Sequence, residues 1–293
     1  MKIGELLRHF LKKIKNKMNF YVHNFALLQS RLVNIENKKE IQFFPKSNWK
    51  RELSHFKKNK IRFIEWAVCN ENLKFNPIFY EKKLSLIKKI CKKNKVRIRS
   101  VDAQFFVQRP IYIGNTLEKK ENYNNLKQVF LNAQILNIKY FIIPALENAT
   151  LDSSYKIKRL FYFIKKLLRN LKKGNFILIE SDLRPKKFKL LIKKFNSKRV
   201  GINYDTGNSA GNGYNFNEEK DYFEYVKNIH IKDKKFRGSS VRLGKGDFNF
   251  KDFFIFLKTI EYKGDFAFQT ARSKSNKHLR EFRLNLKYIK KYV

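Results

Sequence analysis

The stretch VGINYDTGN, at Val200–Asn208, has the pattern of a buried β-strand that ends in an acidic residue, Asp205. Three other short apolar runs also carry a polar residue near their end. NFILIESD carries Glu180, YVKNIHIKD carries His230, and DFAFQTAR carries Gln269 near its end. Each run therefore brings one residue that can bind a metal ion to the carboxyl end of a strand. Active sites of β/α barrels are built in this way.

The rest of the chain supplies further runs of the same kind at the spacing of βα units. The expected strands are Phe25–Gln29, Ile61–Val68, Val96–Asp102, Tyr140–Pro144, Phe176–Glu180, Val200–Asp205, Val226–Ile231 and Phe266–Thr270. A chain of 293 residues is long enough for one (β/α)8 barrel and too short for two large domains. We therefore predict an α/β fold, a single (β/α)8 TIM barrel over residues 19–293.

The first 18 residues, MKIGELLRHFLKKIKNKM, have apolar residues at helical spacing with lysines between them. We expect a basic amphipathic extension at 1–18. It could rest on a membrane surface, or be a pendant helix, or follow an upstream start codon with the native start at Met18. No apolar run is long enough to span a membrane, and no signal-peptide cleavage pattern follows. Together with two isolated cysteines, Cys69 and Cys91, this predicts a cytoplasmic protein.

The charge balance is extreme, with 66 Lys and Arg against 25 Asp and Glu, a formal net charge of +41. One interpretation is a nucleic-acid or anionic-membrane partner. The other is compositional drift, because Lys, Asn, Ile and Phe are abundant together, as in an A/T-rich genome. The lysines are scattered over every helical segment, which argues against a nucleic-acid partner. The charge should still steer anionic small molecules towards the protein.

Four motifs occur together in the second half of the chain: YDTGN, HIKD, LGKGDF and YKGDF. In this combination the chain resembles the sugar phosphate isomerase/epimerase superfamily, the xylose isomerase-like TIM barrels, from about Phe25 to the C-terminus. The resemblance implies isomerisation or epimerisation of a small sugar or sugar phosphate, as part of carbohydrate metabolism. It also implies a divalent metal held by side chains of the late strands.

By this resemblance, Glu180, Asp205 and His230 match three of the family's metal ligands. The fourth ligand is normally a glutamate, and this chain has Gln269 in its place. A mixed oxygen and nitrogen set suits Mn²⁺, Co²⁺, Zn²⁺ or Mg²⁺. The FQTAR ending resembles that of a subgroup loosely labelled hexulose-6-phosphate isomerases.

The expected mechanism removes a proton from the carbon beside a sugar carbonyl and passes through an enediolate that the metal stabilises. Glu180, or a carboxylate beside it, would be the base. Gln269 cannot carry a proton, so Glu65, Asp102 or a metal-bound water must be the second acid. Glu65 lies in an apolar run, where it either pairs with an arginine, Arg31 or Arg97, or faces the substrate.

Four residues are expected to bind the substrate. Arg31, Lys232 and Arg272 could hold a phosphate or carboxylate group, and Asn208 occupies a family position that contacts substrate. Arg31 follows Gln29 in a loop that resembles a Q-G-R-L subgroup, with Ser30 in place of the glycine. The alternative is that this loop only hydrogen-bonds to itself. The glycines of LGKGDF have a structural role in the family, and phosphate binding there is the alternative.

A function of another class is a non-catalytic barrel that binds a sugar or organises a partner, which Gln269 motivates. DNA-repair endonucleases with this fold use three metals and need more histidines at strand ends than this chain has. No feature of the sequence indicates an oligomeric state.

Overall fold

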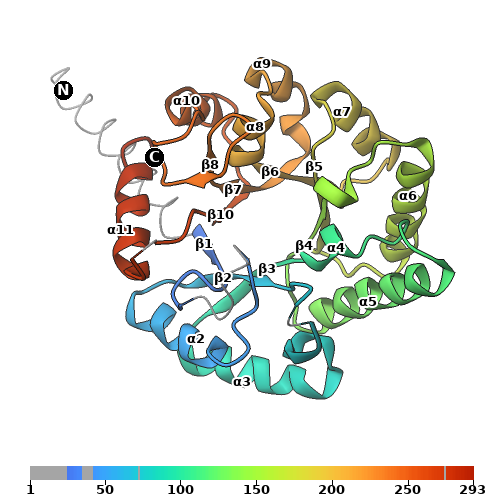
Figure 1. Ribbon diagram of the computed structural model, residues 1–293, viewed down its shortest axis with the longest axis horizontal. Helices are drawn as coiled ribbons and strands as arrows, with labels where there is room; N and C mark the ends of the chain where they lie inside the picture. The colour runs from blue at the N-terminus through green and yellow to red at the C-terminus, as the bar shows by residue number, and fades with distance from the viewer. Residues whose placement is uncertain (1–24, 35–41, 72, 274) are drawn as a thin grey trace, which may run out of the picture.

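The computed structural model describes residues 25–34, 42–71, 73–273 and 275–293 of the chain (Figure 1). Eight parallel strands form a closed barrel in the order β1-β10-β7-β6-β5-β4-β3-β2. The barrel strands are β1 Phe25–Leu28, β2 Phe63–Ala67, β3 Arg97–Asp102, β4 Tyr140–Ala145, β5 Phe176–Ser181, β6 Val200–Asp205, β7 Val226–Ile231 and β10 Asp265–Phe268. The predicted (β/α)8 barrel and its eight strands are thereby confirmed, with bounds that differ by two residues or fewer.

Two further strands, β8 Asp233–Lys234 and β9 Ser240–Val241, form a short antiparallel ribbon outside the barrel. This ribbon follows β7 directly, so it lies over the same end of the barrel as the last residues of that strand. The predicted amphipathic extension at 1–18 lies outside the described residues.

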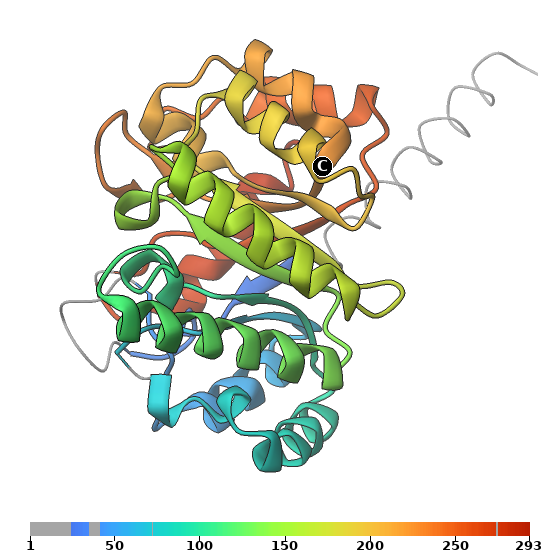
Figure 2. The ribbon, with the colours of Figure 1, turned by 90° about the vertical axis from the view of Figure 1, so that its right-hand side faces the viewer.

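Helices surround the strands, and Figure 2 shows α5 and α6 side by side along the outside of the barrel. The α-helices are α2 Trp49–Lys58, α3 Leu84–Asn94, α4 Phe105–Gln108, α5 Thr116–Ile135, α6 Ser154–Arg169, α7 Pro185–Lys194, α8 Thr206–Asn212, α9 Phe216–Glu219, α10 Phe250–Thr259 and α11 His278–Ile289. Short 3-10 helices are η1 Leu73–Phe75, η2 Pro77–Phe79, η3 Glu81–Lys83, η4 Glu147–Ala149 and η5 Lys220–Tyr225.

Helix α6 shows how the sequence determines this outer layer. Ser153 precedes the helix, and its hydroxyl accepts a hydrogen bond from the Lys156 amide, which satisfies one of the free donors of the first turn. Its buried residues follow the helical period and are Leu160, Phe163, Ile164 and Leu167. Each contributes about 1.5–3 kcal/mol by leaving water. No helix among the described residues is both long enough and apolar enough to cross a lipid bilayer.

The two ends of the barrel carry different side chains. At the end where the strands begin, the carboxylate of Asp265 is paired with Arg99 and with Lys139, whose Nζ lies 2.7 Å from Asp265 Oδ2. At the end where the strands finish lie the carboxylates of Glu65, Asp102, Glu180 and Asp205, together with His230 and Gln269. Because side chains alternate along a strand, residues two positions apart point to the same side and form layers inside the barrel.

Candidate active site

Six polar side chains meet where the barrel strands end, and each is at most 4% exposed. They come from strands that lie far apart in the sequence, so the closed barrel is what brings them together. The six are Glu65 on β2, Asp102 at the end of β3, Glu180 on β5, Asp205 at the end of β6, His230 on β7, and Gln269 directly after β10. All are residues that the sequence had identified.

His230 lies at the centre of this group and faces carboxylates on both sides of its ring. Nδ1 lies 3.2 Å from Glu180 Oε2 and 3.8 Å from Asp205 Oδ2. On the other side, Nε2 lies 2.9 Å from Glu65 Oε1. Burial acts to lower the pKa of His230, but the surrounding carboxylates outweigh it and raise that pKa well above its usual value. Without a bound cation, the surrounding carboxylates thus favour the protonated form of the His230 imidazole.

The atoms of the cluster leave room for a cation. Among the described residues, neither ring nitrogen of His230 makes a hydrogen bond of normal geometry, nor does Glu65 Oε1. Buried polar atoms without a partner are costly. One ligand atom from each of Glu180, Asp205 and His230 falls within 4.8 Å of the others. A divalent ion bound at about 2.0–2.2 Å separates its ligand atoms by about 3 to 4 Å, so these three residues fit such an ion.

The two carboxylate oxygens of Asp205 have different tasks. Oδ1 accepts hydrogen bonds from the amides of Gly207 and Asn208, at 2.7 and 2.9 Å, and so caps the start of α8. Oδ2 faces His230 and Lys232. Burial would raise the pKa of Asp205, but these two cationic groups outweigh it and lower that pKa to about 2. Asp205 is therefore charged and available as a ligand through one oxygen.

A chain of amide side chains orients Glu180. Asn203 and Asn208 each donate a hydrogen bond of 2.7 Å to one of its two oxygens. Asn228 in turn donates to Asn203 at 2.7 Å. Sequence reasoning missed Asn203 and Asn228. The signal was present, because each stands two residues before a predicted ligand on the same strand and so points to the same side.

Glu65 is held in place by a residue that the sequence analysis did not include. Ser100, its neighbour across the β2–β3 pair, donates a hydrogen bond of 2.7 Å to Glu65 Oε2. The other oxygen faces His230. Of the alternatives left open for Glu65, pairing with Arg97 is excluded, because Arg97 is exposed at the opposite end of β3. Glu65 points into the barrel, so its partners are the interior side chains of Ser100 and His230.

Asp102, Gln269 and Lys232 form a second linked group. Asp102 Oδ2 accepts hydrogen bonds from Gln104 at 2.7 Å and from the Gln269 amide at 3.2 Å. Gln269 Oε1 accepts from Lys232 Nζ at 3.0 Å, and that ammonium lies 3.5 Å from Asp205 Oδ2. Burial first, and then the charge of Glu65, raise the pKa of Asp102 to about 8. Lys232 thus lies between Asp205 and Gln269, where an ammonium group has a carboxylate and an amide oxygen as partners.

The two predicted substrate-binding arginines tie the first loop to the last strand. Arg31 Nε donates to the carbonyl of Thr270 at 2.9 Å. Arg272 donates to the carbonyls of Ser30 and Val33, and its Nε has no hydrogen-bond partner among the described residues. The loop after β1 is thus bonded to the segment that follows β10.

The LGKGDF loop is held by the aspartate of HIKD. The amides of Gly244 and Gly246 donate to Asp233 Oδ2 at 2.8 and 2.9 Å, and the Phe248 amide donates to Oδ1 at 3.3 Å. A Cβ on Gly246 would lie 1.9 Å from Asp233 Oδ1, so only glycine fits there. These three amides are occupied by a side chain of the protein, which gives the loop a structural role.

Solved structures with the same fold cover nearly the whole chain. A xylose isomerase-like TIM barrel protein from Mycobacterium smegmatis, in complex with magnesium, is 15% identical with a TM-score of 0.67 and covers 94% of this chain and 97% of its own. The IOLI protein with a zinc atom is 15% identical, with a TM-score of 0.68 and coverage of 92% and 99%. D-psicose 3-epimerase from Clostridium cellulolyticum H10, with D-tagatose, is 10% identical, with a TM-score of 0.68 and the same coverage.

No curated protein matches this sequence. The family model described as Xylose isomerase-like TIM barrel matches residues 54–292, which is most of the chain. The match begins before β2 and ends within the last residues after α11, so it includes seven of the eight barrel strands and all six residues of the cluster. The chain belongs to the xylose isomerase-like TIM barrel family.

Proposed function

We propose that the protein is a metal-dependent isomerase or epimerase of a small sugar or sugar phosphate. The observation that carries the proposal is the group of four buried carboxylates around His230 at the barrel end where active sites of this fold lie. So much buried negative charge is costly unless a cation or protons balance it. In this proposal residues 19–293 are one catalytic domain in the cytoplasm, and 1–18 has no part in the reaction.

Glu180, Asp205 and His230 would hold the divalent cation, which is Mn²⁺, Co²⁺, Zn²⁺ or Mg²⁺. Bound there, a divalent cation supplies Lewis acidity that makes the proton on the carbon beside a sugar carbonyl easier to remove. Gln269 is the proposed fourth ligand through its amide oxygen. That oxygen accepts one hydrogen bond from Lys232, and its second lone pair would be the one that binds the ion.

Two carboxyl groups on different strands are proposed to move the proton. Glu180 is the base, and its two amide donors, Asn203 and Asn208, keep its oxygens aimed at one position. Asp102 is the second acid in preference to Glu65. Glu65 is committed to Ser100 and His230, whereas Asp102 Oδ1 is buried and has no hydrogen-bond partner among the described residues.

The substrate is proposed to carry an anionic group. Asn208 lies beside Glu180, and Lys232 lies beside Asp205. Both side chains can therefore reach a substrate bound next to these two carboxylates. Arg272 keeps its Nε–H free for an acceptor, while Arg31 supports the loop beside it. A phosphate group suits these donors, and the FQTAR ending supports placement in the subgroup with hexulose phosphate substrates.

Proton exchange tests this function directly. We expect metal-loaded protein in D₂O to exchange the proton beside the carbonyl of at least one member of a panel of ketoses, aldoses and their phosphates, followed by ¹H NMR. Asp205→Ala and His230→Ala should each lower bound metal by more than about tenfold, a change of 1.4 kcal/mol. Metal content equal to that of the wild type in both folded variants would refute the ligand assignment.

The second candidate function is a non-catalytic barrel that binds a sugar. It is favoured by the bonding of Gln269 to Lys232 and Asp102, which uses both ends of the amide. In that case the panel would show sugar binding by calorimetry and no proton exchange with any of the four metals. Exchange that disappears in Asp102→Asn while sugar binding persists would instead establish the enzyme.

A further inference from the structure

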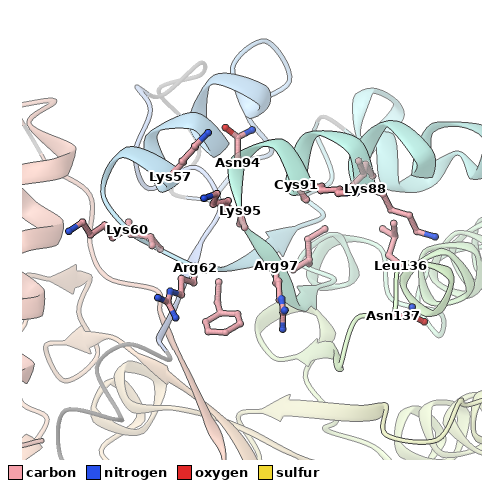
Figure 3. Close-up of a pocket in the computed structure, with 16 residues that line it drawn as sticks. Lys57, Lys60, Arg62, Lys88, Cys91, Asn94, Lys95, Arg97, Leu136 and Asn137 are labelled. Atoms are coloured by element: carbon pink, nitrogen blue, oxygen red, sulfur yellow. The ribbon is translucent and has the colours of Figure 1, made fainter.

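A large basic cavity lies at the end of the barrel opposite the carboxylate cluster. It has a volume of about 920 Å³. Its walls are the carboxyl ends of α2 and α3 and the first residues of β2 and β3 (Figure 3). The cluster around His230 lies where the same strands end, so the two sites do not share a wall. The proposed sugar chemistry makes no use of this cavity.

The lining is cationic and contains no acidic residue. Seven basic side chains line it, and five of them lie outside the last turns of α2 and α3. These five are Lys60, Arg62, Lys88, Lys95 and Arg97. All are exposed, and none of these five forms an ion pair within the described part of the chain. Arg62 and Arg97 are neighbours across the β2–β3 pair, since the Arg97 amide donates to the Arg62 carbonyl at 2.8 Å.

Helix ends explain only a part of this charge. Lys57 and Lys92 stand in the last turns of α2 and α3, where a cation complements the helix dipole. Lys95 also lies at a helix end, as the C-cap residue of α3, whereas Lys60, Arg62, Lys88 and Arg97 lie outside the last turns and their caps. They repel one another across the cavity, so an anion placed among them would be strongly attracted.

The overall composition of the protein does not explain it either. A second cavity, of about 580 Å³, also has four lysines, but Glu224 and Glu261 line it as well. There Lys263 lies 3.4 Å from Glu261. Acidic residues thus accompany the basic residues in the second cavity, whereas no acidic residue lines the first.

The cavity has the size and lining of a small-molecule site rather than of a flat surface for a large partner. Its lining also includes the apolar residues Phe63, Ile87 and Leu136. Small-molecule sites have volumes of about 300–1,000 Å³ and combine an apolar lining with a few polar groups. We propose that this cavity binds a small organic polyphosphate of the size of a nucleoside triphosphate, with its phosphates among the basic side chains and its apolar part against the apolar lining.

Calorimetry with ATP, tripolyphosphate and adenosine tests the proposal, at a constant ionic strength of about 0.15 M so that long-range attraction is screened. The full-length protein should bind ATP at a ratio of one to one, tripolyphosphate more weakly, and adenosine least. The triple variant Lys60→Asn, Lys95→Asn, Arg97→Gln should raise the Kd for ATP by about tenfold or more. Lys60 and Lys95 have φ of 58° and 54°, a conformation that asparagine accepts, so the fold should be kept.

The control variant removes three charges elsewhere: Lys186→Gln, Lys187→Gln, Lys193→Gln, which are exposed on α7. It should bind ATP as the wild type does, and so should Asp205→Ala, which tests the carboxylate cluster separately. Lys88→Gln, at an exposed helix position, should weaken binding by itself. Equal losses in both triple variants, or no binding of ATP, would overturn the proposal. So would cavity-dependent binding of a short oligonucleotide without binding of ATP.

Discussion

His230 is the residue at which the two halves of the carboxylate cluster meet. One ring nitrogen faces Glu180 and Asp205, the proposed ligands, and the other faces Glu65. A carboxylate behind a histidine fixes which nitrogen carries the proton and so leaves the other free for a metal. Ser100 holds Glu65 for this task. The geometry therefore gives Glu65 a positioning role.

Gln269→Glu tests the residue in which this chain departs from the family pattern. A third carboxylate near the ion adds Coulomb attraction, so metal affinity should rise by about tenfold, as measured by calorimetry with Mn²⁺. If the native protein works with glutamine, proton exchange in D₂O should become slower, because the ion is a weaker Lewis acid. If it is a disabled enzyme, exchange should appear. Unchanged affinity would show that residue 269 does not contact the ion.

His278 should make stability depend on pH. Its Nε2 lies 3.1 Å from Asn34 Oδ1, and burial, with repulsion from Arg272 and Arg31, lowers its pKa from 6.5 to about 4. Below pH 6.5 the unfolded chain binds a proton that the folded chain does not, so the free energy of unfolding falls as pH falls from 6.5 to 4.

Urea unfolding at pH 7 and pH 5 measures this effect. Between pH 7 and pH 5, the free energy of unfolding of the wild type should fall by about 1 kcal/mol more than that of His278→Gln. This figure allows for solvent screening. An equal loss in both proteins would mean that other groups cause the pH dependence.

At the scale of elements, the loop between β7 and α10 depends on one aspartate. Asp233 stands at the start of β8 and accepts the amides of Gly244, Gly246 and Phe248. The ribbon of β8 and β9 is thereby fastened over the barrel end that carries His230. The glycines are required by contact distance, because backbone and carboxylate approach each other too closely for a side chain.

Gly246→Ala should destabilise the protein by about 1–3 kcal/mol, because the added methyl group overlaps Asp233 and the carbonyl of Lys234. Gly211→Ala is the matched control. It lies inside α8, where the added Cβ would meet only the side chain of Lys234 at 3.4 Å. There alanine should be neutral or stabilise by up to about 1 kcal/mol. Urea unfolding of both variants at pH 7 decides, and equal stability of the two would contradict the overlap.

At the scale of the whole molecule, the ring of strands is closed by β1, which pairs with β2 on one side and β10 on the other. The first and last strands of the barrel thus stabilise each other by direct pairing. The chain as a whole has a net charge of +41. Acidic residues accompany the lysines in the cavity of about 580 Å³, whereas the cavity of about 920 Å³ has basic residues alone. The local arrangement of charge is therefore a better indicator of a binding site than the total charge.

Deletion of Met1–Lys17 should leave the barrel and any activity intact, because the segment precedes β1 in the sequence. The melting temperature should change by less than about 2 °C, a difference of well under 1 kcal/mol for a domain of this size. Circular dichroism and D₂O exchange on the shortened protein measure both. A large loss of thermal stability would show that the segment packs against the barrel.

The sequence by itself determined the barrel and the end of it at which the candidate ligands lie. Strand period and βα spacing predicted all eight strands, and the proximity of Glu180, Asp205 and His230 followed because residues at strand ends share one end of a barrel. Strand period, βα spacing and the position of a residue at a strand end depend on neighbouring residues, so the sequence pattern alone reveals them. The hydrogen bonds from the Gly244 and Gly246 amides to Asp233 agree with the structural role expected for the LGKGDF glycines.

Only the tertiary structure decided which side chains touch. His230 and Glu65 are 165 positions apart in the sequence. Lys232 contacts Gln269 because they follow the neighbouring strands β7 and β10. Such contacts depend on the stagger of strands around the ring and on the rotamers that packing allows, which no linear pattern records. The same is true of the basic cavity, because scattered lysines become one site only when two helix ends and two strand starts converge.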